Sequence, residues 1–492
     1  MAIVSRKRRR VPSVQYAKVD FSNFLNGINT QYDESIMPLA YAEECVNFCN
    51  DKGVLKTGLG LTELVLPTSI DDPDGGVVMI EDYEAEPIKV MHFRFWEPYA
   101  NEQQNRILIY LDDGRIIFRR IYDTFNLYIT IPEFWFTSVP TLLNYRLNDK
   151  DIGIFMSKTD HLKVWGPAFN RMEIQEAPLM TSMCLHFERI FATVEGKNTS
   201  IWFSDSMDPT NWNVSSAEAG YFHLYDSLGG ANKIISFNNY LYIFRDFGIT
   251  KVTAYADQSD FTVNNIYTSS NVIYAETACI CGDNVFFLAS DGLYGFDGAG
   301  VTKLKLPFEG IFNGMNNSKA QSEFHKNCYY LICNTKFSSS ENNLGTLLEL
   351  NVETGAITLL TNHEFVSITA IRNDLMEKLV VIIKKGIRNI LTQLTHEGKV
   401  LTDSTIKKWK SAMTDLGEPN KIKTIRSISL ISEGDCTVEI ETENKKVSIP
   451  IKGSQLPVRK ALNITGRLIR IGFSTVQQYA KISHPELEIC YK

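Results

Sequence analysis

The strongest constraint on the fold is a strand-rich unit that recurs about every 45 residues through the middle of the chain. Each unit holds at least two runs of apolar, β-branched or aromatic residues, separated by a polar turn such as Asp-Asp-Gly, Asn-Asn or Ser-Asp-Gly. The units begin near Arg106, Asp151, Glu188, Ile234, Glu276, Phe324 and Phe365. Several short strands in a unit of this length are typical of a β-propeller. The sequence therefore predicts an all-β fold in which residues 88–402 form a propeller of about seven blades.

The C-terminal residues 403–492 follow a different pattern, because apolar and polar residues alternate there without the longer repeat. Strand-like runs occur at Thr437–Glu441, Lys446–Ile451, Arg467–Ser474 and Glu486–Tyr491. About 90 residues with five or six short antiparallel strands are typical of a β-sandwich. We therefore expect a separate β-sandwich module after the propeller.

Residues 21–87 offer a candidate for closing the propeller ring. The last blade of such a ring needs a strand from the other end of the chain, since an unpaired edge would otherwise remain. Val46–Phe48 and Val54–Lys56 have strand composition, and Asn50–Gly53 between them has the composition of a tight turn. We expect this hairpin to supply the closing strand.

Residues 1–20 have the composition of a basic arm. Five cationic side chains stand together without an acid, at Arg6, Lys7, Arg8, Arg9 and Arg10. The whole chain carries a net charge of −7, and removing the +5 of this run leaves −12 on the remainder. The acidic body is expected not to bind nucleic acid non-specifically. The basic run is expected to contact an acidic patch on a neighbouring subunit or partner, with DNA as the alternative target.

Few features of the sequence point to a membrane or to disulfides. No run of 18 apolar residues occurs, so no transmembrane helix is expected. The N-terminal residues have no apolar core of the kind found in secretory signals. The nine cysteines are an odd number without zinc-finger spacing, which favours free thiols in a reducing cytoplasm.

Motifs for catalysis and for cofactor binding are missing from the sequence. It contains no GxxxxGK[ST], GxSxG or HExxH pattern, and its eight histidines are spread singly. Paired acids such as Asp112 and Asp113 precede a glycine, where Asp favours the turn itself. We therefore expect no enzyme activity, no cofactor and no metal site.

The most distinctive local motif runs from Ser200 to Trp212. It begins as a strand, continues through a turn rich in Asp, Ser and Pro, and ends at a second tryptophan. The residues singled out for this structural motif are Trp202, Asp205, Asp208, Pro209 and Trp212. The two carboxylates can accept backbone N–H groups, and the proline restricts the turn. The two indoles are expected to pack against the apolar layers of a blade.

Four segments of the chain together resemble a known family. They are the motif WFSDSMDPTNWN, Phe24–Asn29, Val46–Phe48 with Gly53–Gly60, and Val285–Gly298. Their order and spacing are similar to those of β-propeller virion proteins of tailed bacteriophages, namely tail hubs, nozzles and head-to-tail stabilisation proteins. The resemblance covers residues 21–300 well and the C-terminal module loosely. The arginine-rich start and the C-terminal sandwich depart from the family pattern, and the family has no catalytic residues to carry over.

This resemblance implies a structural protein of the virion tail, made in the host cytoplasm, that forms a ring around the DNA channel. It implies a homo-oligomer that contacts other tail or connector proteins, and the six-fold symmetry of phage tails suggests a hexamer. A carbohydrate-binding or carbohydrate-active propeller is the alternative, with the C-terminal sandwich as a binding module. A cellular scaffold for protein partners is a third possibility.

Overall fold

The computed structural model describes residues 15–20, 24, 28, 41–51, 53–64, 69–71, 77–79, 85–97, 102–120, 127–166, 169–196, 199–215, 218–255, 257–306, 310–372, 377–396 and 405–491. The chain divides into two compact units, which are described separately. One unit spans Leu61–Thr395, and the other joins the residues up to Gly60 with His396–Lys492. The described strands pair antiparallel in their sheets, except that Ser69–Asp71 pairs in parallel with Leu127–Ile129. The described residues also form one 3₁₀ turn, η2 (Gln258–Asp260).

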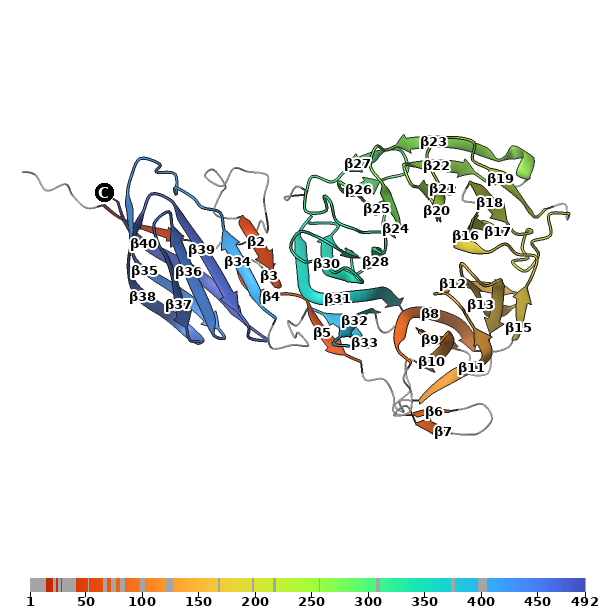
Figure 1. Cartoon of the computed structure of the whole chain (residues 1–492), viewed down its shortest axis with the longest axis horizontal. Coiled ribbons are helices and arrows are strands. Elements are labelled where there is room, and N and C mark those ends of the chain that lie inside the picture. Colours follow the sequence, from red (N-terminus) through yellow and green to blue (C-terminus); the bar gives the residue numbers. More distant parts are fainter. Residues whose placement is uncertain are drawn as a thin grey trace, which may run out of the picture. The chain divides into compact units, whose positions relative to one another are not determined.

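The unit Leu61–Thr395 is a β-propeller with seven blades in the described part of the chain (Figure 1). Blade one contains β8 (Pro87–Glu97), β9 (Glu102–Leu111), β10 (Arg115–Arg120) and β11 (Leu127–Trp135), extended by β6 (Ser69–Asp71) and β7 (Val77–Met79). Blade two contains β12 (Thr141–Leu147), β13 (Lys150–Met156), β14 (Leu162–Gly166) and β15 (Phe169–Ile174). Blade three contains β16 (Met180–His186), β17 (Arg189–Val194), β18 (Ser200–Phe203) and β19 (Gly220–His223).

The remaining four blades follow the same order. Blade four contains β20 (Ala231–Phe237), β21 (Tyr240–Arg245), β22 (Gly248–Thr253) and β23 (Thr262–Thr268). Blade five contains β24 (Ile273–Cys281), β25 (Asn284–Ala289), β26 (Gly292–Phe296) and β27 (Val301–Lys303). Blade six contains β28 (Gln321–His325), β29 (Cys328–Cys333), β30 (Leu344–Asn351) and the first part of β31 (Ile357–Arg372). Blade seven contains the rest of β31, β32 (Glu377–Lys385), β33 (Arg388–Thr395) and β5 (Gly60–Glu63).

Blades six and seven share one long strand. The first part of β31 pairs with β30, and its second part pairs with β32. Asn362 has a positive φ of 65°, and the pairing with β32 shifts register between Phe365 and Ser367. A left-handed residue and a bulge bend a strand. The outermost strand of one blade thereby continues as the innermost strand of the next without a loop.

The ring is closed by β5, which adds to β33 at the outer edge of blade seven. The side chain of Leu61 is buried, and the backbone N–H of Leu64 donates to the carbonyl of Leu391 at 2.8 Å. The expected closing hairpin is therefore corrected. Its two strands, β3 (Phe48–Asp51) and β4 (Val54–Thr57), belong to the other unit, and the next strand along the chain closes the propeller.

Apolar clusters between adjacent blades hold the ring together. Phe93 of β8 packs with Phe155 of β13, and Ile109 of β9 packs with Ile382 of β32. All four side chains are at most 1% exposed. Burial of one large apolar side chain contributes about 1.5–3 kcal/mol. The periodic apolar runs of the sequence thus become the contacts between blades.

In blades two to six, a tight two-residue connection leads from the innermost strand to the second strand. Both central residues have positive φ in blades two, four and six, at Asn148 and Asp149, Asn238 and Asn239, and Lys326 and Asn327. This backbone is that of a type I′ turn, whose twist matches a pair of antiparallel strands. Asn or Asp fills all but one of these positions, because their short polar side chains tolerate the left-handed region.

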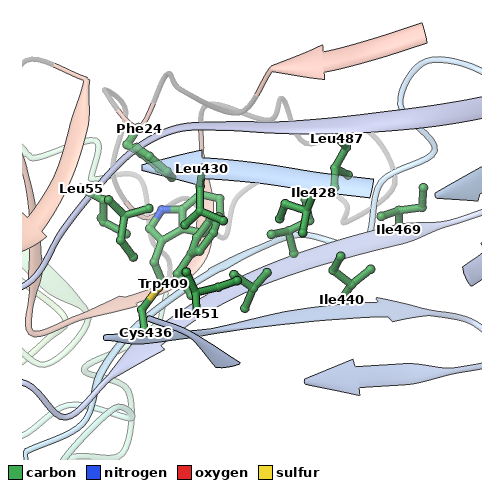
Figure 2. Packing of buried hydrophobic residues seen from close by; sticks show 14 of the residues in the cluster. Phe24, Leu55, Trp409, Ile428, Leu430, Cys436, Ile440, Ile451, Ile469 and Leu487 are labelled. Carbon is green, nitrogen blue, oxygen red and sulfur yellow. The ribbon is translucent and has the colours of Figure 1, made fainter. Parts of the chain in front are cut away.

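The second unit is a β-sandwich, as the sequence predicts. One sheet has the order β3, β4, β40 (Lys481–Tyr491), β35 (Lys423–Glu433) and β38 (Ser454–Gly466), with β1 (Gln15–Asp20) paired to β40. The other sheet has the order β2 (Ala42–Val46), β34 (Lys407–Ser411), β39 (Ile469–Thr475), β36 (Cys436–Thr442) and β37 (Lys446–Ile451). Figure 2 shows the core between the sheets, where Trp409 lies among aliphatic side chains such as Leu430 and Ile451.

The sandwich draws on both ends of the sequence, which corrects the expected boundary at residue 403. The pairs β1–β40 and β4–β40 cover the side of β40 that β35 leaves open. Phe24 contacts the Trp409 ring edge-on, with 5.0 Å between the ring centroids. Residues 403–492 alone would leave the edge of β40 unpaired and this aromatic contact unmade, so the N-terminal strands complete the module.

Candidate functional site

The tryptophan-flanked turn, residues 202–212, begins at the end of β18 and continues beyond it in blade three. Trp212 is 1% exposed and packs in the apolar cluster between blades two and three. Trp202 is half-buried, and its ring stacks on Tyr221 with 4.9 Å between centroids. The two tryptophans therefore lie at different depths of the same blade.

The polar groups of this turn bond mainly to one another. The carboxylate of Asp205 accepts from the Ser206 N–H and from the Asn211 side-chain amide, both at 2.7 Å. Asp208 accepts the N–H and the hydroxyl of Thr210 at 2.9 Å and 2.6 Å. The carbonyl of Pro209 accepts from the Trp212 indole at 2.9 Å. Hydrogen bonds of this kind fix the conformation of the turn.

The basic run predicted to contact a partner comprises Arg6, Lys7, Arg8, Arg9 and Arg10, and it lies outside the described residues. Its role stays a prediction. In the described part of the chain, no cluster of histidine, cysteine, aspartate or glutamate could hold a metal ion. The nine cysteines are free thiols. No helix in the described ranges is long and apolar enough to cross a membrane.

A cavity of about 630 Å³ opens at the carboxyl ends of four inner strands of the propeller. We call it the rim pocket; it is lined by His92, Arg94, Trp96, Asn144, Tyr145, Arg146, Asp151, Leu185, Phe187, Glu188, Met207 and Arg372. These residues come from β8, from the β12–β13 hairpin, from the β16–β17 hairpin, from the tryptophan-flanked turn and from the end of β31. The pocket is therefore formed by blades seven, one, two and three.

Strand alternation brings three of these side chains to one face of β8. His92, Arg94 and Trp96 are spaced two apart, so they project to the same side of the strand. Asn144 of β12 joins the two blades, because its amide accepts from the Arg94 N–H and donates to the His92 carbonyl, each at 3.1 Å. The backbone N–H of Trp96 donates to the carboxylate of Asp151. These bonds hold the first two blades in a fixed relation at the pocket.

His92 is kept neutral within this arrangement. Burial lowers its pKa, and the charges of Arg94 and Arg372 lower it further, although a hydrogen bond to Asn105 acts in the opposite direction. The Nε2 atom lies 2.9 Å from the Asn105 side-chain oxygen. A neutral imidazole beside two guanidinium groups can donate and accept hydrogen bonds along one side of the pocket.

Three arginines from three different strands reach the rim pocket. The Arg146 side chain is 55% exposed and lies 3.9 Å from Asp151, a long and weak ion pair. Arg372 donates to the carbonyl of Phe324 and lies 5.8 Å from the centroid of that ring. Neither the carbonyl nor the ring neutralises its charge. Arg94 is exposed on β8.

The pocket also has an exposed apolar rim. Phe187, in the β16–β17 hairpin, has a positive φ of 50° and is 48% exposed. A bulky residue in this region is strained, and such strain clusters at functional sites. Its ring lies 5.3 Å from the ring of the exposed Tyr255. Met207 of the tryptophan-flanked turn is 69% exposed beside it in the pocket lining.

A row of opposite charges continues from the pocket onto the inner strands of other blades. The Glu323 pKa is raised to about 7, chiefly by burial, while Lys233, Arg372 and Lys89 act to lower it. Burial lowers the Lys89 pKa. These residues lie on the innermost strands of blades one, four, six and seven.

Sequence reasoning found the tryptophan-flanked turn but missed the rim pocket. The pocket residues lie far apart in the sequence, and each is ordinary by itself. One signal was present: His92, Arg94 and Trp96 place polar or charged groups on one face of a strand whose other face is apolar. The closed ring decides which strands face one another at the pocket. The residue pattern of a single strand does not show this.

Comparisons with known proteins identify no family for this chain. No family model matches it, and no curated protein matches it. Similar solved structures include Raptor from Chaetomium thermophilum, with 11% sequence identity and a TM-score of 0.35 over 55% of this chain. They also include a chain from the structure of BBS1N in complex with ARL6DN, soaked with mercury, with 9% identity and a TM-score of 0.40 over 64% of this chain. The match spans 28% of the Raptor chain and 93% of the other chain. The class of protein, a seven-bladed propeller with a β-sandwich, follows from the strand pairing of this chain itself.

Proposed function

We propose that this protein is a structural, non-enzymatic component of a tailed-phage particle, in which it forms a ring in the tail around the DNA channel. The observation that carries the proposal is the rim pocket. Its exposed side chains include a tryptophan, a methionine and three arginines, which are the residue types enriched in the centres of protein interfaces. Such a surface suits assembly with other proteins.

The segments that resemble phage virion propellers support the same proposal. Phe24 and Leu55 pack in the sandwich core, and Val285–Gly298 supplies the hairpin of β25 and β26 in blade five. The tryptophan-flanked turn packs into blade three. The resemblance thus falls on residues that build both units, which is what a shared scaffold requires.

Charge gives a further argument for a place beside DNA. The chain carries a net charge of −12 once the basic run at residues 6–10 is set aside. A wall of the same sign as DNA keeps the nucleic acid from adhering to a channel. The basic run is proposed to hold a neighbouring subunit or partner, with DNA as the alternative, and the ring is proposed to be a homo-oligomer with six copies.

The assembly proposal is tested with the full chain. Negative-stain images and sedimentation of the purified protein are expected to show uniform rings, and immunogold labelling is expected to place the protein in the tail of native particles. Neutral substitution of all five basic residues should weaken assembly in a salt-dependent way, because exposed charge pairs are screened at high ionic strength. A protein that stays monomeric at all salt concentrations and is absent from particles contradicts the proposal.

Carbohydrate binding is the second candidate function, and one observation favours it. Trp202, Tyr221, His223 and Tyr225 form a continuous aromatic row on blade three. Tyr225 is 90% exposed at the end of this row. Aromatic faces of this kind can stack on sugar rings. Binding to a glycan array that is lost on Tyr225→Ala, with unchanged melting, would favour this candidate over assembly.

A further inference from the structure

The rim pocket combines features that point to one kind of occupant. Its volume lies within the range of pockets that hold a small ligand or a few side chains. It has an apolar side, formed by Leu185, Phe187 and Met207, and a cationic side, formed by the three arginines. An occupant must therefore present both apolar surface and negative charge.

The acidic groups of the pocket are already engaged. Asp151 accepts the Trp96 N–H, and the Glu188 carboxylate accepts the Ser206 hydroxyl at 2.9 Å. The Arg372 guanidinium is held by a neutral carbonyl rather than by a carboxylate. Guanidinium groups that meet a carboxylate can form two parallel hydrogen bonds with it. The Arg372 guanidinium can thus receive a carboxylate without first breaking an ion pair to an acidic side chain.

The setting of this pocket strengthens the argument from charge. The chain outside the basic run carries a net charge of −12, yet three arginines converge here from β8, β12 and β31. Each sits at the carboxyl end of an inner strand, so the ring geometry brings them together. A local cationic site on an acidic protein attracts an anionic partner while the rest of the surface repels it.

We propose that the rim pocket binds a peptide segment of a partner protein in which carboxylates flank an aromatic or aliphatic side chain. The apolar side chain packs against Phe187 and Met207, and the carboxylates meet Arg94, Arg146 and Arg372. This inference names the partner chemistry of the proposed assembly function and rests on it.

Protein is favoured over nucleic acid by the shape and lining of the site. A phosphate backbone needs a long cationic track, because each phosphate brings a further charge. The rim pocket is a bounded cavity lined by the carboxylates of Asp151 and Glu188, and the exposed Asp149 lies 3.8 Å from Arg146. These carboxylates would repel an extended polyanion, whereas a short acidic segment can avoid them.

The test uses the full-length protein and a short fluorescent peptide that alternates glutamate with tyrosine. Fluorescence anisotropy should show saturable binding, and the same peptide with glutamine in place of glutamate should bind much more weakly. Arg146→Gln should weaken binding about tenfold, since a charge-assisted hydrogen bond contributes about that factor. Arg388→Gln, an exposed position on β33 away from the pocket, serves as the matched control and should leave the affinity unchanged.

Arg372→Gln is expected to weaken binding as well, but it also removes the hydrogen bond to Phe324, so its melting curve is measured in parallel. Equal binding of the glutamate and glutamine peptides overturns the proposal. So does an Arg146→Gln affinity equal to that of Arg388→Gln. Displacement of the peptide by a lower concentration of oligothymidylate would assign the pocket to nucleic acid and also overturn it.

The outcome separates this inference from the assembly proposal. Arginine-dependent peptide binding by a protein that forms no ring would support the pocket and contradict the ring. Ring formation without peptide binding would contradict the pocket alone.

Discussion

The tryptophan-flanked turn and the rim pocket meet at blade three, and they use their side chains in opposite ways. In the turn, carboxylates, an amide and an indole bond to one another, and Trp212 is buried. In the pocket, arginines and aromatic rings remain exposed at the ends of strands. Met207 belongs to both, since it lies in the turn and lines the pocket. A conspicuous local motif can thus be a structural support whose exposed tip contributes to a site assembled from distant residues.

Trp212→Ala is expected to give the largest effect on stability. Removing this buried indole should lower the free energy of unfolding by about 3–5 kcal/mol, because a cavity remains between blades two and three. Chemical denaturation measures the loss, with Trp135→Ala as the control because that tryptophan is 52% exposed. The folded fraction should bind the acidic peptide with unchanged affinity. A stable variant that specifically loses binding would erase the distinction between turn and pocket.

Glu323→Gln tests the charges beside the pocket through pH. The folded pKa of Glu323, about 7, lies above its ordinary value of 4.5, so the folded state binds more protons between these values. Its contribution to stability is therefore present below pH 4.5 and is lost as pH rises through 7. Relative to the wild type, the variant should gain roughly 3 kcal/mol between pH 4.5 and 8.

Peptide affinity should follow the same titration. Ionised Glu323 offsets part of the Arg372 charge, so wild-type affinity is expected to fall above pH 7 while that of Glu323→Gln stays level. Burial also lowers the His186 and His363 pKa values to about 4, which lowers stability as pH falls from 6.5 toward 4. Both proteins share these histidines, so the difference between them isolates Glu323. Parallel pH curves for the two proteins would show that Glu323 does not titrate in this range.

Asp205→Ala should have a smaller effect, on the turn alone. It removes the acceptor of the Ser206 N–H and of the Asn211 amide, and a loss of about 1–2 kcal/mol in unfolding free energy is expected. Asp149→Asn, at a side chain that is 99% exposed, is the control and should change stability by less than about 0.5 kcal/mol. Equal effects of the two substitutions would mean that the turn's hydrogen bonds contribute no stability.

The same contrast explains what could be predicted from the sequence. The seven-blade propeller and the C-terminal sandwich were predictable, because the repeat period and strand alternation follow from local packing. Strand composition alone cannot distinguish the hairpin of β3 and β4 from β5 as the closing strand, because both have strand composition and only the completed sheets show which one pairs with blade seven. The rim pocket was not predictable, since Arg94, Arg146 and Arg372 meet only after the ring closes.

Phe187→Asn is expected to have the smallest effect on stability and a large one on binding. Asparagine tolerates the positive φ at this position, so the strain of about 1–2 kcal/mol carried by a non-glycine residue is partly relieved. Lost contacts to His186 and Tyr255 offset this gain, because the ring is half exposed. The unfolding free energy should therefore change by less than about 1 kcal/mol, while affinity for the acidic peptide falls about tenfold.

Calorimetric melting and anisotropy on the same sample separate the two quantities. A loss of stability comparable to that of Trp212→Ala would place Phe187 with the supporting residues of the turn, and the strained ring would then have a structural rather than a binding role.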